Sequence, residues 1–412
     1  MPGRPFRFIH ASDFHLERPP HGVVEVPDHL RDAWLDAPYT AARRVFDAAI
    51  AEEAAMLVLA GDVLQPQQTG PRGAAFLAEQ FARLAEHRVA VYWAGGEVDP
   101  PEAWPATFAL PEHVHVFPRG RVAEMVHTRD GLPLARLVGI SRDGDRPIRS
   151  AEFEPDPAGL FSIAVAHGSV EPAAVQSRGL HYWALGGRHA RITPLSTPTT
   201  IHDPGSPQGR CPGEPGVHGC TLVQVDEHGQ ARPSLIATDR LRWLSERIAL
   251  DEGATRQNLE AILGERVRAM LEAAHDVDLL ISWTLGGSGP LIGQLRAGAL
   301  RDEVLDWLRV EHGLESPAAW SVSLEIEPPT SLPTRWYEQE TILGDFLRAI
   351  KQYEVNAAEP IELEAYMAEP HLAGALAAAA RITDKAVRQR VLREAALLGV
   401  DLLSGGEPPE QG

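Results

Sequence analysis

The sequence predicts an α/β fold, and three observations lead to this prediction. Short apolar runs alternate with helix-like segments rich in alanine and leucine over the first 240 residues. The 412 residues are enough for two or three domains. A composition of 44% hydrophobic and 23% charged residues is typical of globular chains rather than disordered ones.

The first 240 residues contain the elements of one domain. A strand-like run over residues 6–11 is followed by predicted buried strands at 56–60, 89–93, 137–140, 161–166 and 180–185. Residues 40–55 and 74–87 predict helices. The stretch 194–220 is rich in proline and glycine, and we expect it to be mostly loop.

A second α/β domain is predicted for residues 241–328. The apolar positions of 254–275 share one helical face, and a strand at 279–283 follows. A further helix is predicted near 300–310. Residues 320–326 alternate apolar and polar side chains, as a half-buried strand does.

The C-terminal region is predicted to be helical after a proline-rich linker at 328–333. Residues 342–350 have one apolar helical face, and residues 371–403 also favour a helix. We therefore expect a helical segment over 334–403. The Gly-, Pro- and Glu-rich tail, 404–412, is expected to be disordered.

Charge and composition restrict the possible partners and location. A formal net charge of −19 argues against indiscriminate polyanion binding, although residues 119–149 carry seven arginines against four acids. Two cysteines cannot form a disulfide scaffold. The sequence has no apolar run long enough to span a bilayer and no signal-peptide pattern, so we expect a cytoplasmic protein.

Aspartate and histidine residues follow several of the predicted strands. The set consists of Asp13, His15, Asp62, Glu97, Asp99, His167 and His189. In open α/β sheets, sites form beyond the carboxyl ends of the strands, so these side chains are expected to converge. Asp and His are ligands for Mn²⁺, Zn²⁺ or iron, and paired ions of this kind can bind a phosphate ester. Each motif alone is typical of a turn or a buried histidine, but the ordered set predicts a metal centre.

Three segments resemble one known family. They are FIHASDFHL at 8–16, LVLAGD at 57–62, and PGSPQGR at 204–210 followed by GCTLV at 219–223. The chain is similar, over about residues 6–245, to calcineurin-like metallophosphoesterases, in particular the SbcD-like exonuclease branch of DNA repair. The resemblance implies a four-layer α/β/β/α sandwich. It also implies that 241–328 is a small capping domain and that 334–403 docks an ATPase partner.

The resemblance also assigns roles to individual residues. One divalent metal, most simply Mn²⁺, would be held by Asp13, His15, Asp62 and His189. Asp62 would also help to hold a second metal, together with His167. Asp62 thereby belongs to the catalytic set as well as to the metal ligands.

Three positions depart from the family pattern. Glu97 stands where the family has an asparagine ligand, and a carboxylate can replace it. Gly187 stands where the family has a histidine ligand, and Val98 replaces the histidine that contacts the scissile phosphate. Asp99 is retained as a catalytic residue that orients a ligand, and Arg188 is expected to contact phosphate. We therefore expect one intact metal site and one damaged site.

Three functions are compatible with this sequence. The first is a metal-dependent phosphodiesterase, an exonuclease-like protein of DNA repair with reduced activity. The second is a non-catalytic subunit that keeps the fold and binds DNA or an SMC-like ATPase through its C-terminal helices. The third is a small-molecule phosphoesterase, since this fold serves many substrates. A homodimer is a further expectation from the resemblance.

Overall fold

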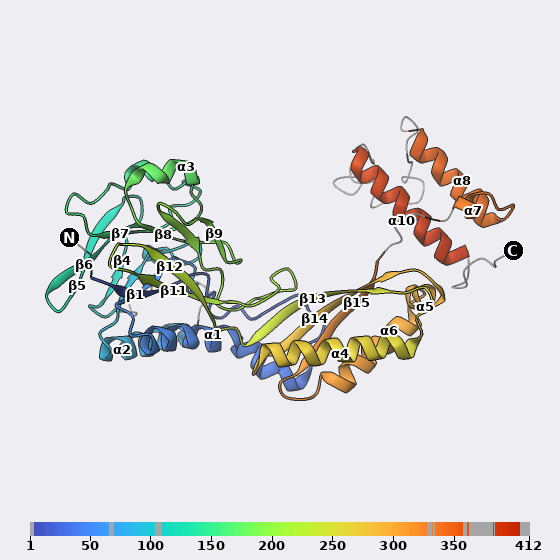
Figure 1. Ribbon diagram of the computed structural model, residues 1–412, viewed down its shortest axis with the longest axis horizontal. Coiled ribbons are helices and arrows are strands. Elements are labelled where there is room, and N and C mark those ends of the chain that lie inside the picture. Colours follow the sequence, from blue (N-terminus) through green and yellow to red (C-terminus); the bar gives the residue numbers. More distant parts are fainter. Residues whose placement is uncertain are drawn as a thin grey trace. The chain divides into compact units, whose positions relative to one another are not determined.

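The computed structural model describes residues 4–403 apart from 66–69, 104–108, 328–331, 333, 357–360, 362–381 and 383. The chain divides into two compact units (Figure 1). Unit 1 contains Met1–Leu244 with Ala274–Leu280, and unit 2 contains Ser245–Ala273 with Ile281–Gly412. The candidate site lies entirely in unit 1.

The first sheet of unit 1 has the strand order β12-β11-β1-β2-β3-β4. Strands β1 to β4 are parallel, and β11 is antiparallel to β1. The bounds are β1 Phe6–Ala11, β2 Met56–Leu59, β3 Ala90–Trp93, β4 Val114–Val116, β11 Gly219–Val225 and β12 Ala231–Ala237. The carboxyl ends of β1, β2 and β3 therefore lie at the same edge of the sheet.

The second sheet of unit 1 has the order β5-β6-β7-β8-β10-β9. Its four middle strands, β6, β7, β8 and β10, are parallel. The bounds are β5 Ala123–Arg129, β6 Leu132–Ile140, β7 Phe161–His167, β8 Tyr182–Gly186, β9 Ile192–Leu195 and β10 Thr200–Asp203. Both sheets thus have neighbouring strand ends that can carry a shared site.

The two sheets pack face to face between two helical layers. Phe8, Met56 and Val58 of the first sheet pack against Ile163 and Tyr182 of the second. Helices α1 (Arg31–Ala51) and α2 (Pro71–Glu86) cover the outer face of the first sheet (Figure 1). Short helical turns, namely η3 (Ser150–Glu152), α3 (Pro172–Val175) and η4 (Gln176–Arg178), lie on the side of the second. This arrangement confirms the predicted four-layer α/β/β/α fold class.

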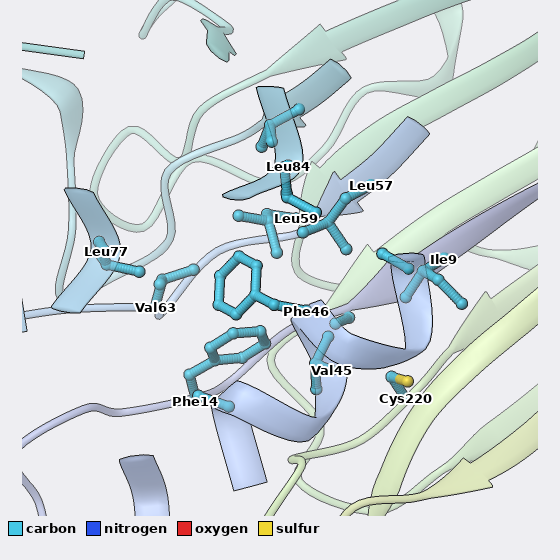
Figure 2. Close-up of a cluster of buried hydrophobic side chains, with 14 of the residues drawn as sticks. Ile9, Phe14, Val45, Phe46, Leu57, Leu59, Val63, Leu77, Leu84 and Cys220 are labelled. Atoms are coloured by element: carbon cyan, nitrogen blue, oxygen red, sulfur yellow. The ribbon is translucent and has the colours of Figure 1, made fainter. Parts of the chain in front are cut away.

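The helical layer is attached by a dense apolar core. Figure 2 shows Val45 and Phe46 of α1 against Leu57 and Leu59 of β2. Phe46 has no exposed surface, and its ring packs edge-on against three other phenylalanines, Phe14, Phe76 and Phe81. This packing fixes the strands whose ends carry the candidate site.

The segment 194–220 is mostly loop, as predicted, but it also contains a strand inside the second sheet. Strand β10 pairs with β8 on one side and β9 on the other. Its four residues, Thr200–Asp203, are all buried, although three of them are polar. The buried His202 is satisfied by the hydroxyls of Thr193 and Thr221, at 2.8 and 2.7 Å. A short polar strand of this kind has no apolar signal to reveal it.

A three-stranded sheet of order β13-β14-β15 and six described α-helices account for most of unit 2, although the first residues of β13 and β14 belong to unit 1. The strands are β13 Leu241–Leu250, β14 Asp278–Gly287 and β15 Ala319–Ile326, and the accompanying helices are α4 Arg256–Ala274, α5 Pro290–Arg296 and α6 Ala299–His312. The buried Trp283 donates a hydrogen bond to Ser321 across this sheet, at 3.0 Å. Each element predicted for 241–328 has a counterpart here, and strand β13 and helix α5 are additional elements.

The C-terminal helices have a small core of their own. They are α7 Thr334–Tyr337, α8 Ile342–Val355 and α10 Lys385–Leu403. Leu343 and Leu347 of α8 pack against Ala396 and Val400 of α10. The predicted linker and tail, and much of the predicted helix before Lys385, lie outside the described residues. Among the helices that are described, none is both long and apolar enough to cross a membrane.

Candidate metal centre

Five of the predicted ligands meet at the carboxyl ends of four strands. Asp13 and His15 follow β1, Asp62 follows β2, His167 ends β7 and His189 follows β8. Two overlapping groups have ligand atoms within 4.8 Å of one another. One group is Asp13, His15 and His189, and the other is Asp13, Asp62 and His167.

The distances show that three imidazoles face two carboxylates. Nε2 of His15 lies 3.9 Å from Oδ1 of Asp13 and 3.9 Å from Oδ2 of Asp62. Nε2 of His167 lies 3.5 Å from Oδ2 of Asp62. Nε2 of His189 lies 4.0 Å from Oδ1 of Asp13. The same atom of each ring is therefore turned toward the carboxylates.

One oxygen of each carboxylate is fixed by the protein. Oδ2 of Asp13 accepts hydrogen bonds from the hydroxyl of Ser12 at 2.7 Å and the amide of Gly187 at 2.8 Å. Oδ1 of Asp62 accepts one from the amide of Val98 at 2.9 Å. Oδ1 of Asp13 is buried and has no hydrogen-bond partner. A buried anionic oxygen without a partner is costly unless a cation or donor reaches it.

Two of the histidines are oriented in the same manner. Nδ1 of His167 lies 2.8 Å from the carbonyl oxygen of Ala60, and Nδ1 of His189 lies 2.7 Å from Oε1 of Glu214. Each Nδ1–H donates to its oxygen, which leaves Nε2 with a free lone pair. Both ring nitrogens of His15 are buried without a partner. These donor atoms fit a divalent cation, whose binding would satisfy them.

The backbone at this centre is strained. Asp13, His15 and Asp62 have φ values of 56°, 45° and 56°. Such left-handed conformations are uncommon for residues other than glycine and occur preferentially at functional sites. The strain turns these three side chains away from the continuing strand direction and into the space between the strand ends.

Burial and neighbouring charges set the protonation of the ligands. Burial, reinforced by the charge of Arg210, lowers the pKa of His15 to about 3, so His15 is neutral at physiological pH. Burial raises the pKa of Asp13, because the charged form is poorly solvated. Burial alone would raise the pKa of Glu214, but the hydrogen bonds from His189 and the amide of Arg210, together with the charges of these two residues, outweigh it and lower the pKa of that carboxyl to about 2. Neutral imidazole is the form that binds a metal.

Asp99 supports the centre through backbone amides. Its buried carboxylate accepts hydrogen bonds from the amides of Asp62 and Val63, both at 2.9 Å, and from the amide of Gly96. Asp99 therefore ties the loop after β3 to the loop after β2. These hydrogen bonds position the backbone of Asp62, and the role of Asp99 in orienting a ligand stays a prediction.

Glu97 belongs to neither ligand group, and the contact of Arg188 with phosphate stays a prediction. The side chain of Glu97 is 70% exposed, and its carboxylate lies 3.6 Å from Arg142. Arg188 is exposed, and its backbone amide donates to Asp203 at 3.2 Å. Gly187 offers only its amide, and a Cβ built there would lie 3.0 Å from Nε2 of His167. The second group consequently contains three ligand residues.

Sequence reasoning missed two residues beside His189. Glu214 holds the His189 ring, and Arg210 lies against it with Nη2 at 3.1 and 3.3 Å from the two ring nitrogens. The segment PGSPQGR contains Arg210, so the motif pointed to this loop without revealing the contact. Glu214 has no signal of its own, because its position depends on a turn.

The chain is similar in sequence to a known protein. No family model matches the chain. The chain is 25% identical over 336 residues to the uncharacterized metallophosphoesterase YhaO of Bacillus subtilis (strain 168), covering 78% of this chain and 81% of that protein. This similarity supports the metallophosphoesterase superfamily. The mixed α/β fold and the candidate ligand groups are consistent with it.

Two solved structures give weaker likenesses. A dimetal phosphatase from Danio rerio has a TM-score of 0.33 and 11% identity, covering 57% of this chain and 100% of that chain. A Staphylococcus aureus protein provisionally assigned as a 5′-nucleotidase, solved with α-ketoglutarate, has a TM-score of 0.34 and 12% identity, covering 66% of this chain and 59% of that chain. Scores this low do not bear on function.

Proposed function

We propose that the protein is a Mn²⁺-dependent phosphodiesterase that acts on DNA with reduced activity. The observation that supports this proposal most strongly is the convergence of five ligand residues. Within this set, Oδ1 of Asp13 and both ring nitrogens of His15 are buried without hydrogen-bond partners. The similarity to a protein named as a metallophosphoesterase supports the phosphoester chemistry. The motif resemblance to the SbcD-like branch supports DNA as the substrate.

The residues around the centre have distinct parts in this proposal. Asp13, His15, Asp62, His167 and His189 would hold the divalent metal. A bound metal supplies positive charge that offsets the charge of the phosphate ester and makes water more acidic. Asp99 and Glu214 keep the ligands in place.

Reduced activity follows from position 98. The side chain of Val98 cannot donate a proton, and general acid help is worth roughly 10²–10⁴ in rate. We therefore expect esters whose leaving group departs as a stable anion to be hydrolysed faster than DNA. Bis-p-nitrophenyl phosphate is such an ester.

The test is hydrolysis of bis-p-nitrophenyl phosphate by the purified full chain with Mn²⁺, alongside Asp62→Ala. Asp306→Ala, on the exposed side of α6, serves as the matched control. We expect hydrolysis by the wild type and the control and its loss in Asp62→Ala. Equal rates in Asp62→Ala and the wild type would refute the metal assignment. Release of nucleotides from end-labelled duplex DNA, again lost in Asp62→Ala, tests the DNA part separately.

A non-catalytic subunit is the second candidate. The observation that favours it is the lack of side-chain ligands from Glu97 and Gly187 in the second group. In this case the chain would keep the fold without hydrolysing phosphate esters, and it would bind DNA, or bind an SMC-like ATPase through residues 334–403. Co-purification of an ATPase with the full chain and its loss on deleting 335–412 would support this candidate. The buried face of α8 already packs on α10, so docking would have to use other positions.

A further inference from the structure

The guanidinium of Arg210 is placed against the metal centre without a recorded role. Its Nη2 lies 3.1 Å from Nδ1 and 3.3 Å from Nε2 of His189. One atom cannot lie in line with the lone pairs of both ring nitrogens, so the guanidinium rests against the imidazole. Nδ1 of His189 already donates to Glu214. The contact with His189 therefore does not use up the donor capacity of the arginine.

The backbone of Arg210 is tied to the same carboxylate. Its amide donates to Oε2 of Glu214 at 2.8 Å, while Oε1 of Glu214 accepts from His189. Nη2 of Arg210 is 3.9 Å from Oε1, which is too long for a hydrogen bond. Its carbonyl oxygen accepts from the amide of His21 at 2.7 Å. Glu214 thus holds the backbone of Arg210, whereas the guanidinium of Arg210 makes no hydrogen bond to the carboxylate of Glu214.

The side chain of Arg210 has a buried donor to spare. It is only 13% exposed, and its Nε is buried without a hydrogen-bond partner. Buried guanidinium donors are normally paired, most favourably with a carboxylate or a phosphate oxygen. A positive charge beside His15 and His189 also opposes cation binding at these ligands. An anion bound beside the metal would pair with the guanidinium of Arg210 and would offset its positive charge next to His15 and His189.

We propose that Arg210 binds a non-bridging oxygen of the phosphate group that occupies the metal centre. This inference rests on the proposed function and names the group that recognises the phosphate. It assigns to Arg210 the phosphate contact that was expected of Arg188. Glu214 is the positioning residue, because it holds both Arg210 and His189.

The experiment measures two equilibria on the full-length protein, neither of which requires hydrolysis. Free Mn²⁺ is counted by electron paramagnetic resonance, and inorganic phosphate binding to the Mn²⁺-loaded protein is measured by calorimetry. The variants are Arg210→Met, which approximately keeps the length of the side chain, and Arg210→Lys, which keeps the charge but lacks the planar set of guanidinium donors. Arg188→Met is the rival variant, and Arg232→Met, at a 76%-exposed position on β12, is the matched control.

We expect Arg210→Met to weaken phosphate binding on the order of ten- to hundredfold while Mn²⁺ affinity stays equal or increases. Arg210→Lys should fall between Arg210→Met and the wild type, and Arg232→Met should match the wild type. Unchanged phosphate affinity in Arg210→Met, with Mn²⁺ still bound, would overturn the inference and leave the metal centre standing.

Two further outcomes would also overturn it. A loss of Mn²⁺ affinity in both Arg210 variants would mean that the residue merely supports His189. A large effect of Arg188→Met, with none in Arg210→Met, would assign the contact to Arg188. A wild type that binds no Mn²⁺ would refute the proposed function first, and this outcome is visible before any phosphate is added.

Discussion

Replacing His202 by glutamine should remove part of the protein's sensitivity to acid. His202 has no exposed surface and lies between the hydroxyls of Thr193 and Thr221. Burial, with a further contribution from the charge of Arg191, lowers the pKa of His202 to about 3 from its ordinary 6.5. The amide of glutamine offers one donor and one acceptor side, as neutral imidazole does, but does not titrate.

The sign and size of the effect follow from proton linkage. Above pH 6.5 His202 is neutral in both the folded and the unfolded chain, so it has no pH-dependent effect there. As the pH falls from 6.5 toward 3, the unfolded chain takes up a proton that the folded chain refuses, and stability is lost. At about 1.4 kcal/mol per pH unit, the loss at pH 5.0 is about 2 kcal/mol.

The assay is urea unfolding of the wild type and His202→Gln at pH 7.5 and pH 5.0, with EDTA to exclude metal binding. Other titrating groups act in both proteins and cancel in the difference. We expect the stability of the variant relative to the wild type to improve by about 2 kcal/mol between the two pH values. A difference that is the same at both pH values would refute the assignment of this acid sensitivity to His202.

Three further predictions concern the centre and its support. Glu214→Gln should weaken Mn²⁺ binding roughly 10- to 100-fold, because His189 loses its anionic hydrogen-bond partner. Calorimetry measures this affinity, and an unchanged value would contradict the prediction. Val98→His should raise hydrolysis of DNA at least about tenfold by restoring a proton donor, and a gain that persists in Val98→His/Asp62→Ala would rule that explanation out. Phe46→Ala should lower the free energy of unfolding by about 3–5 kcal/mol, because it removes a fully buried ring; a urea midpoint equal to that of the wild type would be incompatible with the packing described.

The elements that the sequence predicted correctly share a strong local signal. The apolar runs that became β2, β3, β7 and β8 are buried except for the half-buried first residue of β3, so composition alone identified them. The convergence of Asp13 and Asp62 was predictable because β1 and β2 are parallel neighbours whose carboxyl ends lie at one edge of the first sheet. His167 ends β7 of the second sheet, so its position also depends on how the two sheets pack.

The errors arose where tertiary contacts override the local pattern. Strand β10 is polar, and its hydrogen-bond partners lie on neighbouring strands. Glu97 is 70% exposed and lies 3.6 Å from Arg142, which is distant in sequence. The contacts of Arg210 and Glu214 with His189 join residues more than 20 positions apart, so no spacing rule could reveal them. The side-chain positions of Glu97, Arg210 and Glu214 depend on how their loops fold, which local sequence does not determine.

The geometry of Gly187 bears on how a further ligand could be added to the centre. The residue has φ of 101°, a backbone conformation that L side chains rarely adopt, and a Cβ there would press on Nε2 of His167. A histidine at position 187 would therefore encounter backbone strain and a crowded neighbour before it could provide a ligand. A variant that adds a ligand here would need a different loop conformation as well as a new side chain. Position 98 has no positive φ and already carries a side chain, so it is the more accessible place for a new functional group.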